Sequence, residues 1–146
     1  MYVKEFLSFV ASTYQLKDVK GHVTRVIEQV GLEEECHKKI HSLSKGYKQR
    51  VGLAQAIIHD PKVLILDEPT SGLDPNQLAD IRLLIKELGK QRTVILSTHI
   101  MQEVEALCDQ VIIINRGSIV VNSTLSDLKA SHQSTSLEDI FRKLTA

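Results

Sequence analysis

The sequence is poor in cysteine, carries no net charge and contains no long apolar run. Its two cysteines, Cys36 and Cys108, lie far apart and in no metal-type pair, which argues against a disulfide framework and suggests reduced thiols in a cytosolic setting. Lys plus Arg and Asp plus Glu both number 18, so the chain lacks the strongly basic balance of a protein that wraps nucleic acid. No run approaches the roughly 18 to 20 apolar residues of a membrane span.

Two amphipathic helices are predicted at the start of the chain, which has 146 residues and a hydrophobic content of 42%, enough for a domain with its own core. Apolar residues recur at helical spacing over 2–14, where Phe9 broadens the apolar face, and again over 20–30. Gly31 is a natural stop for the second helix. The apolar positions of the two stripes are Val3, Phe6, Leu7, Val10, Val23, Val26, Ile27 and Val30. Because both helices precede any strand pattern, the chain opens with a small helical unit.

A helix start rich in basic residues follows at 43–50. Ser44 is suited to N-cap this helix, and Gly46 would let a ligand approach the backbone closely. A helix amino terminus offers N–H groups and a positive dipole end to an anion such as phosphate. Lys45, Lys48 and Arg50 add positive charge there. Taken alone, the segment would be interpreted as an ordinary capped helix with a basic first turn.

The chain is organised around a short apolar run, 63–66, that ends in two adjacent carboxylates, Asp67 and Glu68. A run without polar alternation predicts a strand buried on both faces, as in parallel sheets under helices, and Pro61 and Pro69 limit its length. Ligands of open α/β sheets bind at the carboxyl ends of the strands. One carboxylate could hold a hard cation such as Mg²⁺, and the other could orient or deprotonate a water. A solvated acidic strand end is the alternative.

A tight turn and a further helix come next. Asp74 is suited to N-cap that helix, Pro75 fits its first position, and Gln77 completes a capping-box pattern. The helix buries an apolar stripe and ends at Gly89. Its apolar positions are Ile81, Leu84, Ile85 and Leu88.

Strands and helices continue to alternate beyond this helix. A buried strand is predicted over 93–98, followed by a helix, a buried strand over 111–114 and a short strand over 118–121. The alternation predicts parallel strands joined by right-handed crossovers. The polar residues that this arrangement would bring to one edge of the sheet are Asp67, Glu68 and His99.

The end of the chain carries a weaker pattern. A short capped helix is predicted over 124–129, a polar loop over 131–135, and a last amphipathic helix from Ser136 onward. The apolar face of the last helix more often forms a core or docking surface than a separate module.

Four segments together resemble the ATP-binding cassette (ABC) ATPases. Residues 43–47 resemble the signature motif of that family, and the run that ends at Asp67 and Glu68 stands in the place of the Walker B strand. Residues 71–74 look like the D-loop, and His99 looks like the switch histidine. The four segments follow the order and spacing of the family and cover about 42–117. The commonest signature is Leu-Ser-Gly-Gly-Gln, and this chain departs from it at two positions, Lys45 and Tyr47, which leaves the fine tuning of phosphate contacts open.

The resemblance implies a role for each residue at the strand ends. Asp67 would bind Mg²⁺ through water, and Glu68 would act as the general base on the attacking water. His99 would contact the γ-phosphate of ATP and relay the state of the site. These roles suit phosphoryl transfer, which depends on positioning and electrostatic stabilisation more than on covalent chemistry by the protein.

The resemblance also implies a partner subunit. The family works as a head-to-tail dimer with ATP between two subunits, and the signature of one subunit touches nucleotide held mainly by the other. The ATP contacts implied at the signature involve Ser44, Lys45, Gly46 and Tyr47, and Asp74 would cross the interface.

The fold that the resemblance implies is α/β, a partial P-loop NTPase-like parallel sheet flanked by helices and preceded by a helical subdomain. Residues 1–58 would form the helical subdomain with the signature, 59–121 the C-terminal part of the ATPase core, and 122–146 a helical extension. The helical subdomain would face a transmembrane permease, so the protein would sit peripherally on the cytoplasmic face of the membrane, with no nucleic-acid partner. The short ending resembles bacterial transporter ATPases that export lipids, drugs or gliding-associated cargo.

One motif of the family is absent. The 146 residues contain no Gly-x-x-x-x-Gly-Lys-Ser/Thr, the Walker A loop that cradles the α- and β-phosphates and supplies a lysine to the γ-phosphate. We therefore expect the sequence to be a fragment that begins inside the helical subdomain. Such a piece should expose an apolar edge or face of its sheet and should not hydrolyse ATP alone.

Two alternative functions remain open. An ABC ATPase of the DNA-repair, chromosome-organising or translation type would not serve transport, although the repair type normally has a long coiled coil before its signature, and 1–35 shows no sustained heptads. A non-catalytic half that only binds a cassette partner is the other alternative.

Overall fold

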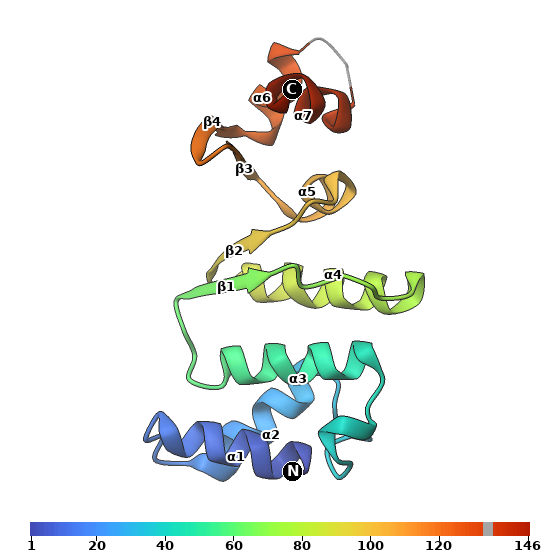
Figure 1. Ribbon diagram of the computed structural model, residues 1–146. Helices are drawn as coiled ribbons and strands as arrows, with labels where there is room; N and C mark the ends of the chain where they lie inside the picture. The colour runs from blue at the N-terminus through green and yellow to red at the C-terminus, as the bar shows by residue number, and fades with distance from the viewer. Residues whose placement is uncertain (133–135) are drawn as a thin grey trace. The chain divides into compact units, whose positions relative to one another are not determined.

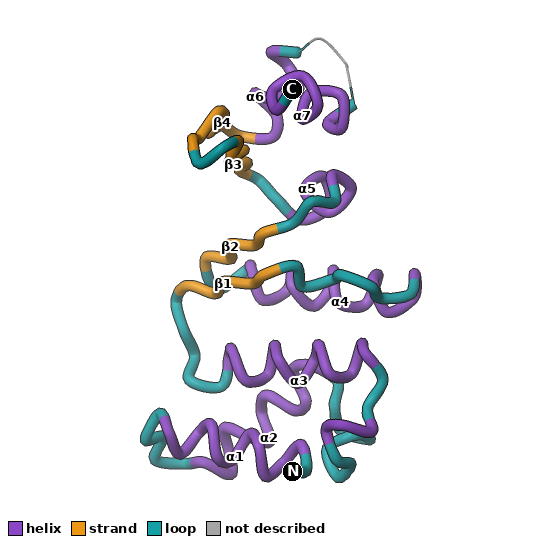
Figure 2. Tube along the Cα trace, in the orientation of Figure 1, coloured by secondary structure: helices purple, strands orange, loops and turns teal. Residues whose placement is uncertain are grey.

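The computed structural model describes residues 1–132 and 136–146, and within them the chain has an α/β fold of helices and two small sheets. Packing divides the chain into two compact units, Met1–Ser97 and Thr98–Ala146. Figure 1 follows the chain through the helices and strands of both units, and Figure 2 distinguishes helix, strand and loop along the same trace. The division into 1–58, 59–121 and 122–146 stays a prediction.

The first unit opens with the predicted helical group. Helices α1 (Val3–Thr13), α2 (Val19–Val30) and α3 (Lys45–Ile57) contact one another, and a short 3₁₀ helix, η1 (Ile40–Ser42), precedes α3. The apolar stripes of α1 and α2 form the core of this group, as predicted. Its buried residues include Val3, Leu7, Val10, Ala11, Val23, Val26, Ile27 and Val30.

The prediction for Phe9 is wrong. Its side chain is 63% exposed, while Leu7 is fully buried. A step of two residues from Leu7 turns about half-way round a helix, so Phe9 lies on the far side of α1 from the core. Ala11, four residues after Leu7, occupies the buried face in its place.

Local capping explains where α2 begins and ends. The Asp18 carboxylate accepts a hydrogen bond of 2.9 Å from the backbone N–H of Gly21, which satisfies one donor of the first turn. At the other end, Gly31 has a φ of 66° in the left-handed region, where a residue without Cβ carries the least strain.

A parallel strand pair with a helical crossover completes the first unit. Strand β1 (Val63–Asp67) pairs in parallel with β2 (Thr93–Ser97), and α4 (Pro75–Gly89) connects them. The register places Asp67 opposite Ser97 at the carboxyl end of both strands. This part of the predicted parallel sheet is confirmed.

The two faces of the β1–β2 pair differ in burial. On one face Leu64 and Leu66 are buried, and α4, whose Gly89 lies close to Val94, contacts β2 on this side. On the other face Ile65 is 73% exposed and Ile95 is 53% exposed. The prediction that β1 is buried on both faces is therefore wrong for the described residues, because α4 covers only one of them. The expected exposure of apolar sheet surface is confirmed.

The second unit contains an antiparallel hairpin instead of a third parallel strand. Strand β3 (Gln110–Asn115) pairs with β4 (Ser118–Thr124) through a tight turn at Arg116 and Gly117, whose φ values are 49° and 78°. Two consecutive residues with positive φ suit the right-handed twist of a two-residue hairpin. The prediction that β3 pairs in parallel is wrong within the described residues, because its pairing partner there is the strand that follows the turn.

Three helices pack around this hairpin. They are α5 (Met101–Leu107), α6 (Leu125–Ser131) and α7 (Leu137–Thr145), and their start positions agree with the helices predicted after His99, at 124 and after Ser136. The loop predicted over 131–135 is described only in part: Ser131 belongs to α6, and residues 133–135 lie outside the described residues. The core of this unit consists of Val104, Val111, Ile113, Leu128, Leu137 and Ile140.

None of the helices in residues 1–132 and 136–146 is both long and apolar enough to cross a lipid bilayer.

The helical group of the first unit should depend on the buried stripe of α2. Ile27 is 4% exposed, so Ile27→Ala should lower the free energy of unfolding of this unit by about 2 to 5 kcal/mol through lost burial and a residual cavity. Urea unfolding followed by circular dichroism measures the change. Thr24→Ala, at an exposed position of the same helix, is the matched control and should stay within about 0.5 kcal/mol. Equal losses in the two variants would contradict the packing described.

The Cys108 thiol should react slowly with alkylating reagents in the folded chain. Burial of the side chain, together with the nearby carboxylates of Asp109 and Glu103, raises the pKa of Cys108 above its ordinary value. Less thiolate is then present at a given pH, and the thiolate is the reactive form. Iodoacetamide labelling from pH 7 to 10, read by peptide mass spectrometry, should show a slower reaction at Cys108 in the folded chain than in urea. A labelling rate in the folded chain equal to the rate in urea would contradict the raised pKa of Cys108.

Candidate functional site

The signature segment forms the start of α3. The Ser44 hydroxyl accepts a hydrogen bond of 3.4 Å from the backbone N–H of Tyr47, and the backbone N–H of Lys48 donates to the Ser44 carbonyl at 3.0 Å. Ser44 is thus the N-cap, as predicted. The first turn of α3 consists of Lys45, Gly46 and Tyr47, so the backbone N–H groups and the positive dipole end of the helix lie at this segment.

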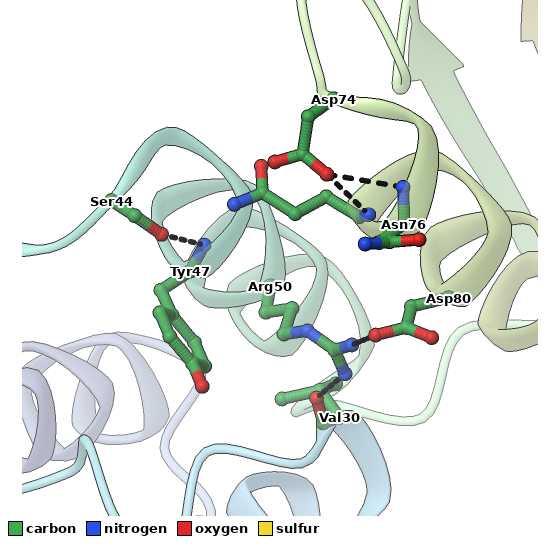
Figure 3. A network of polar contacts seen from close by, with 8 residues as sticks. Val30, Ser44, Tyr47, Arg50, Asp74, Asn76 and Asp80 are labelled. Carbon is green, nitrogen blue, oxygen red and sulfur yellow. Dashed lines mark hydrogen bonds and ion pairs between the residues drawn. The ribbon is translucent and has the colours of Figure 1, made fainter.

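The segment that resembles the D-loop forms the turn before α4. Asp74 accepts hydrogen bonds of 3.0 Å from the backbone N–H groups of both Asn76 and Gln77 (Figure 3). Pro75 stands at the first helical position. Gly72, with a φ of 67°, lets the chain turn sharply after β1. The Asp74 side chain therefore defines the start of α4, as predicted.

These two segments contact each other within the first unit. A Cβ at Gly46 would lie 2.7 Å from Cδ of Gln77, and a Cβ at Gly72 would overlap the Lys45 ammonium group. Gly46 is buried, and the Gln77 side chain occupies the space that a larger residue would need. The sequence suggested that Gly46 admits a ligand, and the structure adds a second requirement for glycine, the close packing of α3 against α4.

The two adjacent carboxylates lie at the exposed carboxyl end of β1. The Ser97 hydroxyl donates a hydrogen bond to Oδ1 of Asp67, and the backbone N–H of Glu68 donates to the Ser97 carbonyl at 3.0 Å. Glu68 has a φ of 43°, and its carbonyl accepts a hydrogen bond from the Ser71 N–H, so the strand turns at this residue. Positive φ at a non-glycine residue costs free energy and recurs at functional sites.

Ser97 is a residue of this site that the motifs did not single out. Its hydroxyl holds one oxygen of Asp67 in place, which restricts the orientation of the carboxylate. The signal that could have found it is register, because Ser97 ends the neighbouring strand at the level of Asp67.

His99 belongs to the second unit, two residues after β2, and its side chain is exposed. Beside it in sequence, the Thr98 hydroxyl donates to Oε2 of Glu103 at 2.7 Å and accepts from the backbone N–H of Ile100 at 3.1 Å. Glu103 is fully buried, a feature that the sequence pattern of α5 did not indicate. The expected meeting of His99 with Asp67 and Glu68 at one edge stays a prediction, because the two units are described separately.

A divalent cation at this site would need oxygen ligands from outside the described residues. Asp67 and the Ser97 hydroxyl present hard oxygen donors of the kind that Mg²⁺ prefers. Within residues 1–132 and 136–146, however, no group of three or more His, Cys, Asp or Glu side chains is arranged to hold a metal. The donor set fits an ion that keeps several waters and takes phosphate oxygens as further ligands.

Comparison with known proteins identifies the family of the chain. Residues 2–71 match the family model described as "ABC transporter", and residues 39–105 match one described as an AAA domain, putative AbiEii toxin, type IV toxin–antitoxin system. The ABC transporter ATP-binding protein YxlF of Bacillus subtilis, itself uncharacterized, is 42% identical over 135 residues, which cover 91% of this chain and 46% of YxlF.

Two solved structures share the fold. The structure of an ATP-binding subunit of an ABC transporter superposes with a TM-score of 0.83 at 28% identity and covers 100% of this chain and 63% of that one. CbiO1 of Clostridium perfringens, part of the ABC transporter complex CbiONQ, superposes with a TM-score of 0.78 at 31% identity, over 98% of this chain and 56% of CbiO1. This chain thus spans between 46% and 63% of the length of these three proteins. On the signature, the carboxylate-tipped strand and these matches, the chain belongs to the ATP-binding protein family of ABC transporters.

Proposed function

We propose that the subunit carrying this chain binds and hydrolyses ATP in a head-to-tail dimer and thereby drives transport of a substrate across a membrane. The observation that carries the proposal is the contact between the signature segment and the D-loop segment in one compact unit that also presents Asp67 and Glu68 at the end of β1. The relatives named as ABC transporter ATP-binding proteins support the transport role.

Asp67 and Glu68 would divide the work at the end of β1. Ser97 holds Oδ1 of Asp67, which leaves Oδ2 suited to accept a hydrogen bond from a water of Mg²⁺. Mg²⁺, when bound, would neutralise charge on the phosphate oxygens. Glu68 follows in a tight turn with its side chain exposed, where its carboxylate would orient and deprotonate the attacking water. His99 would contact the γ-phosphate.

The start of α3 would serve the nucleotide held mainly by a second subunit. The Ser44 hydroxyl oxygen accepts from the Tyr47 N–H, and its own O–H can still donate to a phosphate oxygen. Lys45 and the first-turn N–H of Gly46 would supply positive potential for the same anion, and Tyr47 completes this turn. Asp74 lies between Gly72 and Gln77, which adjoin Lys45 and Gly46 of this segment, and it would reach the dimer interface.

The proposed transporter role also implies partner proteins. A transmembrane permease would contact the helical group α1–α3, and the subunit would sit peripherally on the cytoplasmic face of the membrane. Helices α1 and α2 have 11 and 12 residues, far shorter than the coiled coil of a DNA-repair ABC ATPase, which favours the transporter reading. CbiO1, described as part of a transporter complex, offers an example of such an assembly.

Replacement of the proposed base should stop turnover and spare binding. In the intact subunit, Glu68→Gln should lower the rate of phosphate release by about 10²- to 10⁴-fold, because the amide cannot take a proton from water. ATP binding, measured by equilibrium titration, should persist. Glu87→Gln, which removes an exposed carboxylate of α4 paired with Lys90, is the charge-matched control and should keep the normal rate. Unchanged phosphate release in Glu68→Gln would remove Glu68 from this role.

The 146-residue chain by itself should bind ATP very weakly and should not hydrolyse it, because it has no Walker A loop. We expect a dissociation constant weaker than about 1 mM by calorimetric titration with Mg²⁺ and ATP, that is, less than about 4 kcal/mol of binding free energy. The intact subunit, titrated under the same conditions, is the positive control. Micromolar affinity in the chain alone would contradict the proposal that the missing loop supplies most of the phosphate contacts.

A further inference from the structure

One arginine joins three helices of the first unit. Arg50 lies in α3, and its side chain is only 19% exposed. Its Nη1 donates a hydrogen bond of 2.7 Å to the backbone carbonyl of Val30, the last residue of α2, and its Nη2 donates one of 3.0 Å to Oδ2 of Asp80 in α4 (Figure 3). The planar guanidinium thus binds two acceptors from two different helices while its stem belongs to a third.

The contact with α2 satisfies the end of that helix. The last carbonyl groups of an α-helix have no partner within the helix, and the C-terminal end of its dipole is negative, so a cation is stabilising there. Gly31 allows the approach, because a Cβ at this position would lie 3.0 Å from Nη1 of Arg50. The α2 end is therefore shaped to receive this side chain.

The contact of Arg50 with α4 accompanies a second contact between α3 and α4. Gln77 of α4 packs on Gly46 of α3, and one helical turn further along each helix Asp80 pairs with Arg50. Two contacts one turn apart fix both the separation and the register of the helix starts. Those starts carry the signature segment and Asp74, so the geometry between them depends on both contacts.

We propose that Arg50 is a positioning residue for the ATPase: it holds the signature segment and the Asp74 segment of one subunit in a fixed relation and links both to the end of α2. The proposal rests on the proposed function. Through the Val30 carbonyl, a displacement of α2 passes to the segments on both sides of the α3–α4 contact. A lysine at position 50 could bind either acceptor but not both in the geometry of a guanidinium fork.

The first experiment uses the 146-residue chain without nucleotide. Amide hydrogen exchange by NMR is compared among wild type, Arg50→Gln, Asp80→Asn and the double variant. Exchange of the capped amides of Tyr47, Asn76 and Gln77 should accelerate about tenfold in each single variant and no further in the double variant, as expected for one coupled contact. Val51→Ala, a buried position of the same helix, is the control for general loss of stability.

The exchange pattern separates positioning from a local structural role. If Arg50 only completed the end of α2, the acceleration in Arg50→Gln would be confined to the amides of Gly31 and Leu32, which donate to α2 carbonyls. That result, or equal acceleration in Val51→Ala, would overturn the proposal.

The second experiment measures steady-state hydrolysis in the intact subunit. Arg50→Gln and Asp80→Asn should each lower kcat about tenfold and leave KM for ATP within about twofold, because the Arg50 guanidinium is bound to the Val30 carbonyl and to Asp80. The double variant should equal the singles. Arg50→Lys should recover part of kcat. Normal kcat in both single variants would refute the positioning role. An intact wild-type subunit without ATP turnover would instead refute the proposed function, and the exchange experiment alone would then decide whether Arg50 couples the two segments.

Discussion

The parallel pairing of β1 with β2 is the constraint on which the site depends. It sets Asp67 level with Ser97, so that a hydroxyl from one strand orients a carboxylate on the other. The backbone N–H of Glu68 extends the same ladder by one further hydrogen bond to the Ser97 carbonyl. A shift of one residue in register would remove both interactions and turn the apolar residues of β1 away from α4. The strand pair and the chemistry at its end are therefore specified together.

Helix α4 connects this strand pair to the signature helix. Its apolar face packs beside the strands, its first turn is capped by Asp74, and its side chains Gln77 and Asp80 meet α3. One helix thus contacts the sheet, the D-loop and the signature helix within a single compact unit. Close packing makes these contacts interdependent, because a dense interior transmits small displacements.

Local patterns predicted much of this structure, and tertiary contacts account for what they missed. Caps such as Asp18, Ser44 and Asp74 fix helix starts through hydrogen bonds within a few residues, so they can be recognised from sequence. The direction in which β3 pairs depends on which strand lies beside it, and the hydrophobic periodicity of the sequence does not identify that strand. Arg50 bonds to Val30, which is 20 positions away in the sequence, and to Asp80, which is 30 positions away. The burial of Glu103 depends on how the second unit packs around it.

The conformation of Glu68 has a consequence for how this position tolerates change. A glutamate with a φ of 43° raises the free energy of the folded chain by about 1 kcal/mol or more, whereas glycine adopts the same conformation with little strain. Foldability alone would favour glycine or asparagine immediately after β1. If Glu68 is the proposed base, its carboxylate carries this conformational cost for the sake of reactivity. A change to glycine that relaxed the backbone and stabilised the fold would then remove the group on which the proposed hydrolysis depends.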